Sequence, residues 1–283
     1  LSLVGSEMCI RDRYECVAKI LRSANIKYVK WDMNRQLSDL GSTYLDEDSQ
    51  QELFHRYVLG MYAMQERLVQ EFPDLLLENC SGGGARFDPG MLYYSPQIWC
   101  SDDTDAIERL EIQEGTALIY PLCAMGAHVS VCPNHTVGRV TPFTTRGHVA
   151  LAGTFGYELD ITKLPEEERK LIPEQTAMYH KYHELIRDGE YYRILSYREN
   201  HRSDCWAVAS EDKNEVLVTY VQVLAQVNMP SRKVRLRGFD PAKKYRLEGT
   251  DEVYSGEMLM NAGFRMKDFW GDFKSRLYHF TAK

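Results

Sequence analysis

The chain has 283 residues, of which 44% are hydrophobic and 27% charged, a composition that can bury a sizeable core and excludes a disordered protein. Its formal net charge of −7 is spread along the sequence without a basic block, and no apolar run reaches the roughly 20 residues of a membrane span, which argues against nucleic-acid and membrane partners. Seven cysteines without any C-x-x-C pair indicate neither a zinc ribbon nor a disulfide framework, so we expect reduced thiols and a cytoplasmic location. We also expect no cofactor.

The first residues differ in character from the rest of the chain. The stretch Leu1–Asp12 has no initiator Met and lacks the charged, apolar and small-residue regions of a signal peptide. It resembles translated adapter sequence. We therefore treat residues 1–13 as a non-native head and expect the native start of the protein to be missing.

From residue 14 to 188, amphipathic stretches alternate with short apolar runs, the rhythm of repeated β-strand and α-helix units. We expect strands at Lys27–Lys30, Leu75–Glu78, Ile98–Ser101, Ala127–Val131 and Thr154–Tyr157, and helices near 14–25, 49–72, 105–120, 143–152 and 165–187. The polar clusters follow the strand ends, which is the active face of a (β/α)8 TIM barrel. Five units cannot close an eight-stranded barrel, so we predict an α/β fold holding strands 4–8, and an open α/β sheet is the alternative.

After Gly189 the pattern changes to short alternating runs separated by polar residues, Gly and Pro. Such a pattern is typical of an antiparallel β-sandwich of about seven strands. We place the domain boundary near 188–190, which gives a partial barrel over 14–188 and a C-terminal β-sandwich domain over 189–283. The expected strands are 191–197, 206–210, 216–223, 232–236, 244–247, 257–260 and 275–281.

The motif Lys30-Trp31-Asp32-Met33-Asn34-Arg35 ends the first strand. Alternate residues of a strand share a face, so Lys30, Asp32 and Asn34 project together. Asp32 is a candidate nucleophile, because the opposite charge of Lys30 favours an ionised carboxylate. The alternative is that Asp32 caps a following helix.

A second acidic cluster, Trp99-Cys100-Ser101-Asp102-Asp103-Thr104-Asp105, follows another strand. Asp102 is a candidate general acid, because neighbouring carboxylates and partial burial raise the proton affinity of a carboxyl group. In the alternative interpretation the run caps the next helix through Thr104 or Asp105. Trp99 is either a platform for a sugar ring or a core residue.

Between these clusters lies the Gly-rich turn Glu78-Asn79-Cys80-Ser81-Gly82-Gly83-Gly84-Ala85-Arg86. It lacks the spacing and the Lys of a phosphate loop, and close approach of the backbone to a ligand explains consecutive glycines as well. We expect Cys80 and Gly82 to contact a sugar. His128, Cys132 and His135 fit no zinc signature, so we expect no metal site.

In order along the chain, the segments 28–35, 78–88, 99–106 and 126–135 together resemble the α-galactosidases of glycoside hydrolase family 36, retaining (β/α)8 enzymes. The resemblance implies that Asp32 is the nucleophile and Asp102 the acid/base. It also implies that galactose is contacted by Lys30, Trp31, Asn34, Cys80, Gly82 and Trp99. An α-galactoside oligosaccharide such as melibiose or raffinose is then the substrate, hydrolysed by double displacement, and the protein is a homo-oligomer.

Alternatives remain within and outside this class of enzyme. One is a related retaining enzyme, namely an α-N-acetylgalactosaminidase, an α-glucosidase or a transglycosylase. Another is a sugar-binding remnant without catalysis. Family members also carry a large N-terminal β-sandwich and three earlier barrel strands, so we expect the 283-residue chain by itself to be inactive.

Overall fold

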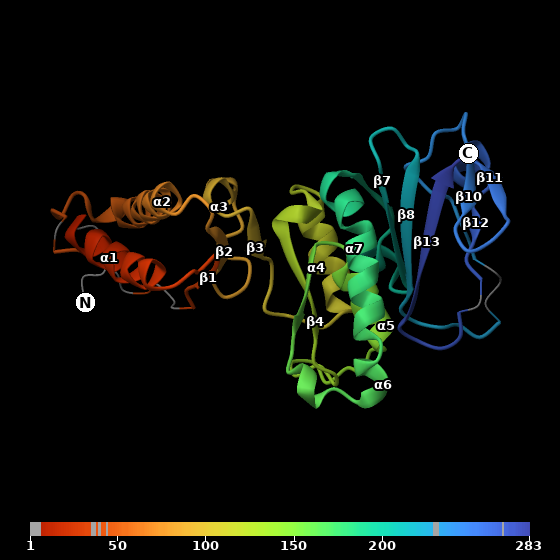
Figure 1. The fold of residues 1–283 in the computed structure, drawn as a ribbon, viewed down its shortest axis with the longest axis horizontal. Helices are drawn as coiled ribbons and strands as arrows, with labels where there is room; N and C mark the ends of the chain where they lie inside the picture. The colour runs from red at the N-terminus through yellow and green to blue at the C-terminus, as the bar shows by residue number, and fades with distance from the viewer. Residues whose placement is uncertain (1–6, 35–37, 39–40, 44, 229–231, 268) are drawn as a thin grey trace. The chain divides into compact units, whose positions relative to one another are not determined.

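A computed structural model describes residues 7–34, 38, 41–43, 45–228, 232–267 and 269–283 (Figure 1). They form two compact units, residues 1–102 and 103–283. Arg35 of the first polar motif and the first six residues of the expected head lie outside the described residues. The rest of that head, from Glu7, is the first part of a helix.

The first unit is a parallel α/β arrangement (Figure 1). Strand β1 pairs with β2 and β2 with β3, all in parallel, so their carboxyl ends share one edge. Helices α1 and α2 pack together through residues spaced three and four apart, which is the periodicity of one helix face. The elements are α1 Glu7–Ser23, β1 Tyr28–Asp32, η1 Gln50–Glu52, α2 Leu53–Glu71, β2 Leu76–Cys80, α3 Pro89–Tyr94 and β3 Gln97–Trp99.

Sequence patterns did not predict helix α3. Its start has a clear local cause, because the Asp88 carboxylate accepts the backbone N–H groups of Gly90 at 2.8 Å and Met91 at 3.0 Å, and Pro89 occupies the first turn. The Asp-Pro pair was the available signal. At six residues, α3 is too short to leave a periodic apolar pattern.

The second unit begins with another parallel pair, β4 and β5, which align Ala127 with Phe155. The helix predicted at 165–187 is two helices, because Pro173 lacks an N–H and fits only the first turn of a helix. The elements here are α4 Glu108–Ala117, η2 Leu122–Ala124, β4 Met125–Ser130, α5 Phe143–Ala150, β5 Thr154–Glu158, η3 Ile161–Lys163, α6 Glu166–Arg169 and α7 Ile172–Asp188.

An antiparallel sheet in the order β11-β10-β13-β8-β7-β6 completes the second unit, with a separate β12-β9 ribbon. One face of the sheet buries an aromatic core that contains Tyr220, Tyr245 and Phe280. The elements are β6 Glu190–Leu195, α8 Tyr197–Asn200, β7 Ser203–Ala209, β8 Glu215–Gln222, β9 Lys233–Val234, β10 Lys244–Leu247, β11 Val253–Ser255, α9 Gly256–Asn261, β12 Phe264–Arg265 and β13 Lys274–Ala282. Helical structure gives way to strands between α7 and β6, but the domain boundary near 188–190 stays a prediction.

The strand predicted at Glu257–Met260 is wrong, because these residues belong to helix α9. The Ser255 hydroxyl accepts the Met258 N–H at 3.1 Å and caps the helix. Gly256 begins it where an added Cβ would lie 2.0 Å from the Asp240 carbonyl oxygen. The short strands β11 and β12, which flank α9, were also missed.

Candidate active site

The carboxyl ends of β1 and β2 place two of the polar motifs side by side. In the register of this pair, Lys30 aligns with Glu78 and Asp32 with Cys80. Side chains two residues apart share a face of a strand, so the face that carries Lys30 and Asp32 on β1 adjoins the face that carries Glu78 and Cys80 on β2. The motif and the Gly-rich turn that follows Cys80 therefore form one site.

Asp32 is exposed, and its carboxylate accepts a hydrogen bond from the side chain of Asn34. The Asn34 amide donates from Nδ2 to Asp32 Oδ2 at 2.8 Å, and its Oδ1 accepts the Gly82 N–H, also at 2.8 Å. In the described part of the chain the next helical turn after β1 begins at Gln50. Asp32 therefore caps no described helix, and the capping alternative is wrong there.

Lys30 does not pair with Asp32 as expected. Its ammonium lies 3.5 Å from Glu78 Oε1 and 4.7 Å from the centroid of the Trp99 ring. The Glu78 side chain is only 1% exposed, and its Oε2 also accepts the Tyr28 hydroxyl and the Gln97 Nε2 amide. A buried carboxylate needs such partners. Sequence reasoning missed Glu78 as the anchor of Lys30, although its place two residues before Cys80 on the same strand was a usable signal.

Cys80 faces Asp32 as a hydrogen-bond donor. Burial, with a further contribution from the hydrogen bond to Asp32, raises the pKa of the Cys80 thiol to about 11. The thiol is therefore protonated near neutral pH. A protonated thiol can donate to a carboxylate but is a poor nucleophile, which excludes a cysteine hydrolase at this position.

The glycines let the turn lie against the backbone that carries Asp102. A Cβ on Gly83 would lie 2.8 Å from both the Asp102 nitrogen and the Ser101 Cα, and one on Gly84 would lie 2.5 Å from the Cys100 carbonyl oxygen. Side chains at these positions would therefore push the two segments apart. The turn contacts Asn34 through Gly82 and the Asp102 segment through Gly83, so it links the two acidic motifs.

Trp99 supports Asp102. The Trp99 residue is only 1% exposed, and its indole N–H donates to Asp102 Oδ1 at 3.1 Å. A buried ring has no open face, so in this chain Trp99 is no platform for a sugar. Asp102 itself is exposed. Trp31 points the other way along β1 and packs against the apolar core of the first unit.

Within the second unit, Asp105 caps helix α4, as one of the alternatives predicted. Its buried carboxylate accepts the N–H groups of Ile107 and Glu108 at 3.0 Å each and forms an ion pair with Arg139. The negative charge of the Asp105 carboxylate is therefore paired with the Arg139 guanidinium. Asp105 therefore stabilises the start of helix α4.

His128 lies 3.5 Å from the Glu158 carboxylate. Among the described residues, no group of three or more His, Cys, Asp or Glu side chains is placed to hold a metal ion. The same residues include no helix that is long and apolar enough to cross a membrane.

Two acidic motifs at the carboxyl ends of parallel strands are the arrangement of a barrel-type glycoside hydrolase. Residues 4–189 match the Melibiase family model, and residues 203–280 match the Glycosyl hydrolase family 36 C-terminal domain. The chain belongs to the melibiases of glycoside hydrolase family 36. The family resemblance seen in the motifs is thus confirmed.

The relatives include α-galactosidases of known structure. The chain is 49% identical to α-galactosidase AgaA of Geobacillus stearothermophilus over 268 residues, which cover 95% of this chain and 36% of that protein. It is also 49% identical to α-galactosidase Mel36A of Lactobacillus acidophilus over 274 residues, which cover 96% of this chain and 37% of that protein. The AgaA crystal structure matches with a TM-score of 0.95 over 98% of this chain and 38% of its own. The predicted fold class is confirmed, and the chain spans a little over a third of these relatives.

Proposed function

We propose that this chain carries both catalytic carboxylates of a retaining α-galactosidase, which releases terminal α-D-galactosyl residues from oligosaccharides. Asp32 is the nucleophile and Asp102 the acid/base. The observation that carries the proposal is the Gly82-Gly83 turn, which donates a hydrogen bond to the amide that holds Asp32 and packs against the backbone of Asp102.

The relatives support the choice of substrate and of the two acids. AgaA is known in complexes with raffinose and with stachyose; the first carries an Asp-to-Asn substitution, the second an Asp-to-Ala substitution, and the substituted residues are 70 positions apart. Asp32 and Asp102 are separated equally (102 − 32 = 70). Both ligands contain an α-galactosyl unit, which favours α-galactosides over α-glucosides or N-acetylated sugars.

The reaction proceeds in two displacements. In the first, Asp32 attacks the anomeric carbon while Asp102 donates its proton to the departing glycosidic oxygen, which leaves a β-galactosyl ester on Asp32. In the second, Asp102 takes a proton from water, the water oxygen attacks the same carbon, and α-galactose departs with Asp32 restored as a carboxylate. We expect the two carboxyl groups to lie about 5–5.5 Å apart, the separation of retaining enzymes.

Other residues of the site bind or position. Lys30, Asn34, Cys80 and Gly82 present an ammonium, an amide, a thiol and a backbone group near Asp32, and we assign them to the galactose hydroxyls. Trp99 is a positioning residue that orients Asp102 through its N–H. We assign Trp31 no direct contact, because it packs against the core.

The decisive test uses hydrolysis of nitrophenyl α-galactoside by a full-length protein that contains this chain, because we expect the 283-residue chain by itself to be inactive. Asp32→Ala should lower kcat by roughly 10⁴-fold or more, and Asp102→Asn by roughly 10²- to 10⁴-fold. Asp74→Asn, which changes an exposed acid paired with Lys27, is the matched control and should keep full activity. Full activity in Asp32→Ala would refute the assignment.

Two further assays separate the alternatives. Proton NMR of the first-formed sugar should show α-galactose, since an inverting enzyme would release the β-anomer. Parallel assays with nitrophenyl α-glucoside and the N-acetyl-α-galactosaminide should give far lower kcat/KM. Binding of galactose without turnover of any of the three would favour a sugar-binding remnant.

We also propose a cytoplasmic, homo-oligomeric protein. Among the described cysteines, those at positions 16, 80, 123, 132 and 205 are free thiols, which suits a reducing compartment. Thiol counting on freshly lysed cells and light scattering of the purified protein test the two statements separately.

A further inference from the structure

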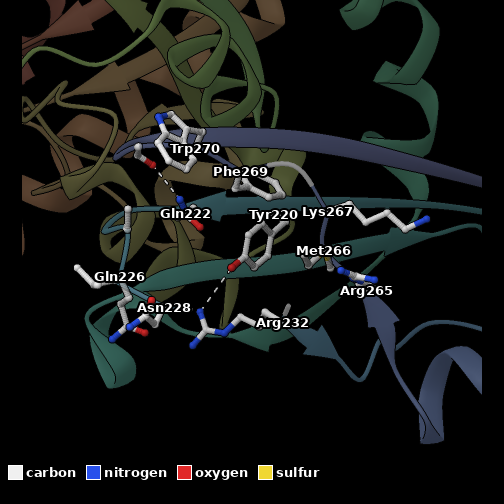
Figure 2. A pocket seen from close by; sticks show the side chains of 13 residues that line it. Tyr220, Gln222, Gln226, Asn228, Arg232, Arg265, Met266, Lys267, Phe269 and Trp270 are labelled. Carbon is white, nitrogen blue, oxygen red and sulfur yellow. Dashed lines mark hydrogen bonds between the residues drawn. The ribbon is translucent and has the colours of Figure 1, made fainter. Parts of the chain in front are cut away.

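A cavity of about 980 Å³ opens on the second unit, beside the aromatic core at Tyr220. Figure 2 shows its walls, which come from the end of β8, the segment 225–228, Arg232, and residues 265–267 and 269–271 between β12 and β13. The volume lies at the upper end of the roughly 300–1,000 Å³ of small-molecule sites.

Aromatic side chains form one wall. Phe269 meets Tyr220 edge to face at 4.9 Å between ring centroids, and the Arg276 guanidinium lies 5.6 Å from the Phe269 ring. These contacts fix the inner rings. Trp270 is 91% exposed at the opening, so its indole ring is open to a ligand that enters the cavity.

Hydrogen bonds hold the walls in place without a ligand. The Gln222 side chain donates to the Gly271 carbonyl at 2.8 Å, and the Ala225 N–H donates to Asp272 Oδ1 at 2.7 Å. Arg232 donates to the Tyr220 hydroxyl at 3.4 Å, a contact that Figure 2 marks with a dashed line. These hydrogen bonds fix the described part of the walls, which reduces the entropy lost on binding.

The remaining polar groups suit hydroxyl groups. Among the described residues, the exposed amides of Gln226 and Asn228 make no hydrogen bond, so each offers a donor and an acceptor to a ligand. No carboxylate is among the described residues that line the cavity. Its cations are partly engaged, since Lys267 lies 3.3 Å from Glu252, so a fully charged anion has less to gain here than a neutral polyol.

We propose that this cavity is a second carbohydrate-binding site, taking a neutral oligosaccharide whose sugar ring stacks on Trp270. The C–H bonds on one face of a pyranose match the electron-rich face of an indole, and the amides of Gln226 and Asn228 pair with the hydroxyls at the ring edge. The choice of an α-galactoside as ligand rests on the proposed function. The site would hold a substrate oligosaccharide near the enzyme between turnovers.

The test is calorimetry with stachyose on the Asp32→Asn variant, in which turnover is stopped. We expect two binding sites per chain. Adding Trp270→Ala should remove one of them or weaken it at least about tenfold, and adding Gln226→Ala should raise its Kd roughly fivefold. Tyr93→Ala, which removes another exposed aromatic residue, is the matched control and should leave both sites.

Other results separate failure of this site from failure of the proposed function. A single site that is unchanged by Trp270→Ala would overturn the proposal, whatever the activity of the wild-type chain. Sugar binding that depends on Trp270, in a protein that never hydrolyses α-galactosides, would uphold this site and reject the enzyme. If Trp270→Ala instead turned an oligomer into monomers without affecting sugar binding, the cavity would be a protein interface and the proposal would fail.

Discussion

The side-chain amide of Asn34 donates to the Asp32 carboxylate over 2.8 Å, and the same amide is itself fixed by the Gly82 N–H. Asn34 can present its NH₂ to Asp32 only because its oxygen faces the Gly-rich turn. This short chain of hydrogen bonds joins β1 to the turn after β2, and it orients an exposed carboxylate that has few other constraints.

Removing this amide should therefore reduce catalysis without unfolding the protein. In a full-length protein that contains this chain, we expect Asn34→Ala to lower kcat roughly 10- to 100-fold, because a nucleophile that is free to rotate is less often in the attacking position. Thermal unfolding should change little, since Asn34 is exposed. Asn261→Ala, at the exposed end of α9, is the matched control. An unchanged kcat in Asn34→Ala would mean that Asp32 is positioned by other groups.

Adjacent glycines of the turn should respond very differently to the same substitution. Gly83→Ala places a Cβ 2.8 Å from backbone atoms of Ser101 and Asp102, at a φ of +81°, and we expect a loss of at least about 2–3 kcal/mol of stability together with most activity. Gly82→Ala meets no atom within 4 Å, so only its positive φ costs energy, about 1 kcal/mol. Urea unfolding of the two variants measures the difference. Equal losses would contradict the close approach of the turn to Asp102.

Cys80 should resist alkylation. Because burial and the hydrogen bond to Asp32 raise the pKa of its thiol to about 11, the thiolate fraction at pH 8 is on the order of 10⁻³. Iodoacetamide at pH 8 should modify the exposed Cys16 and leave Cys80 intact, as read by peptide mass spectrometry. Rapid labelling of Cys80 in the folded protein would show that its thiol is not buried against the carboxylate.

Stability should fall as the pH rises toward neutrality because of Asp204. This residue is 3% exposed, and burial, with Glu114 nearby, raises its pKa from 3.8 to about 7 although Tyr197 N–H and Arg193 oppose the shift. A raised carboxyl pKa means that the folded chain holds a proton that the unfolded chain releases. The free energy of unfolding therefore decreases from about pH 4 to pH 7, by at most about 4 kcal/mol, and levels off above that range.

The neutral variant isolates this effect. Asp204→Asn should flatten the pH dependence between 4 and 7 and leave the protein more stable than the wild type at pH 8, while its side-chain oxygen can still accept the Tyr197 N–H. Urea unfolding at pH 5 and pH 8 provides both values. Asp251→Asn, in a fully exposed side chain, is the control. An identical pH slope in wild type and Asp204→Asn would assign the proton to another group.

Local patterns predicted the parallel strands well, because a short apolar run followed by a polar cluster is typical of a strand that ends at the edge of a parallel sheet. Strands were predicted at Lys27–Lys30 and Leu75–Glu78 and are found at Tyr28–Asp32 and Leu76–Cys80. The pattern was less reliable where one capping residue decides the outcome. Residues Glu257–Met260, predicted as a strand, form a helix whose start is capped by Ser255. Asp88 caps the start of helix α3, which is too short to show a periodic apolar pattern.

The candidate active site shows a similar contrast between features that are local in the sequence and contacts that are not. Residue order alone identified the two acidic motifs and the Gly-rich turn, because each lies within a few positions of a strand end and its chemistry can be read locally. Contacts between residues that lie far apart in the sequence could not be predicted. Lys30 pairs with Glu78, 48 positions later (78 − 30 = 48), and the glycines accommodate the backbone at Asp102. Pairing of β1 with β2 and the packing of the turn bring these groups together, and both depend on burial of the whole unit, which no short stretch of sequence encodes.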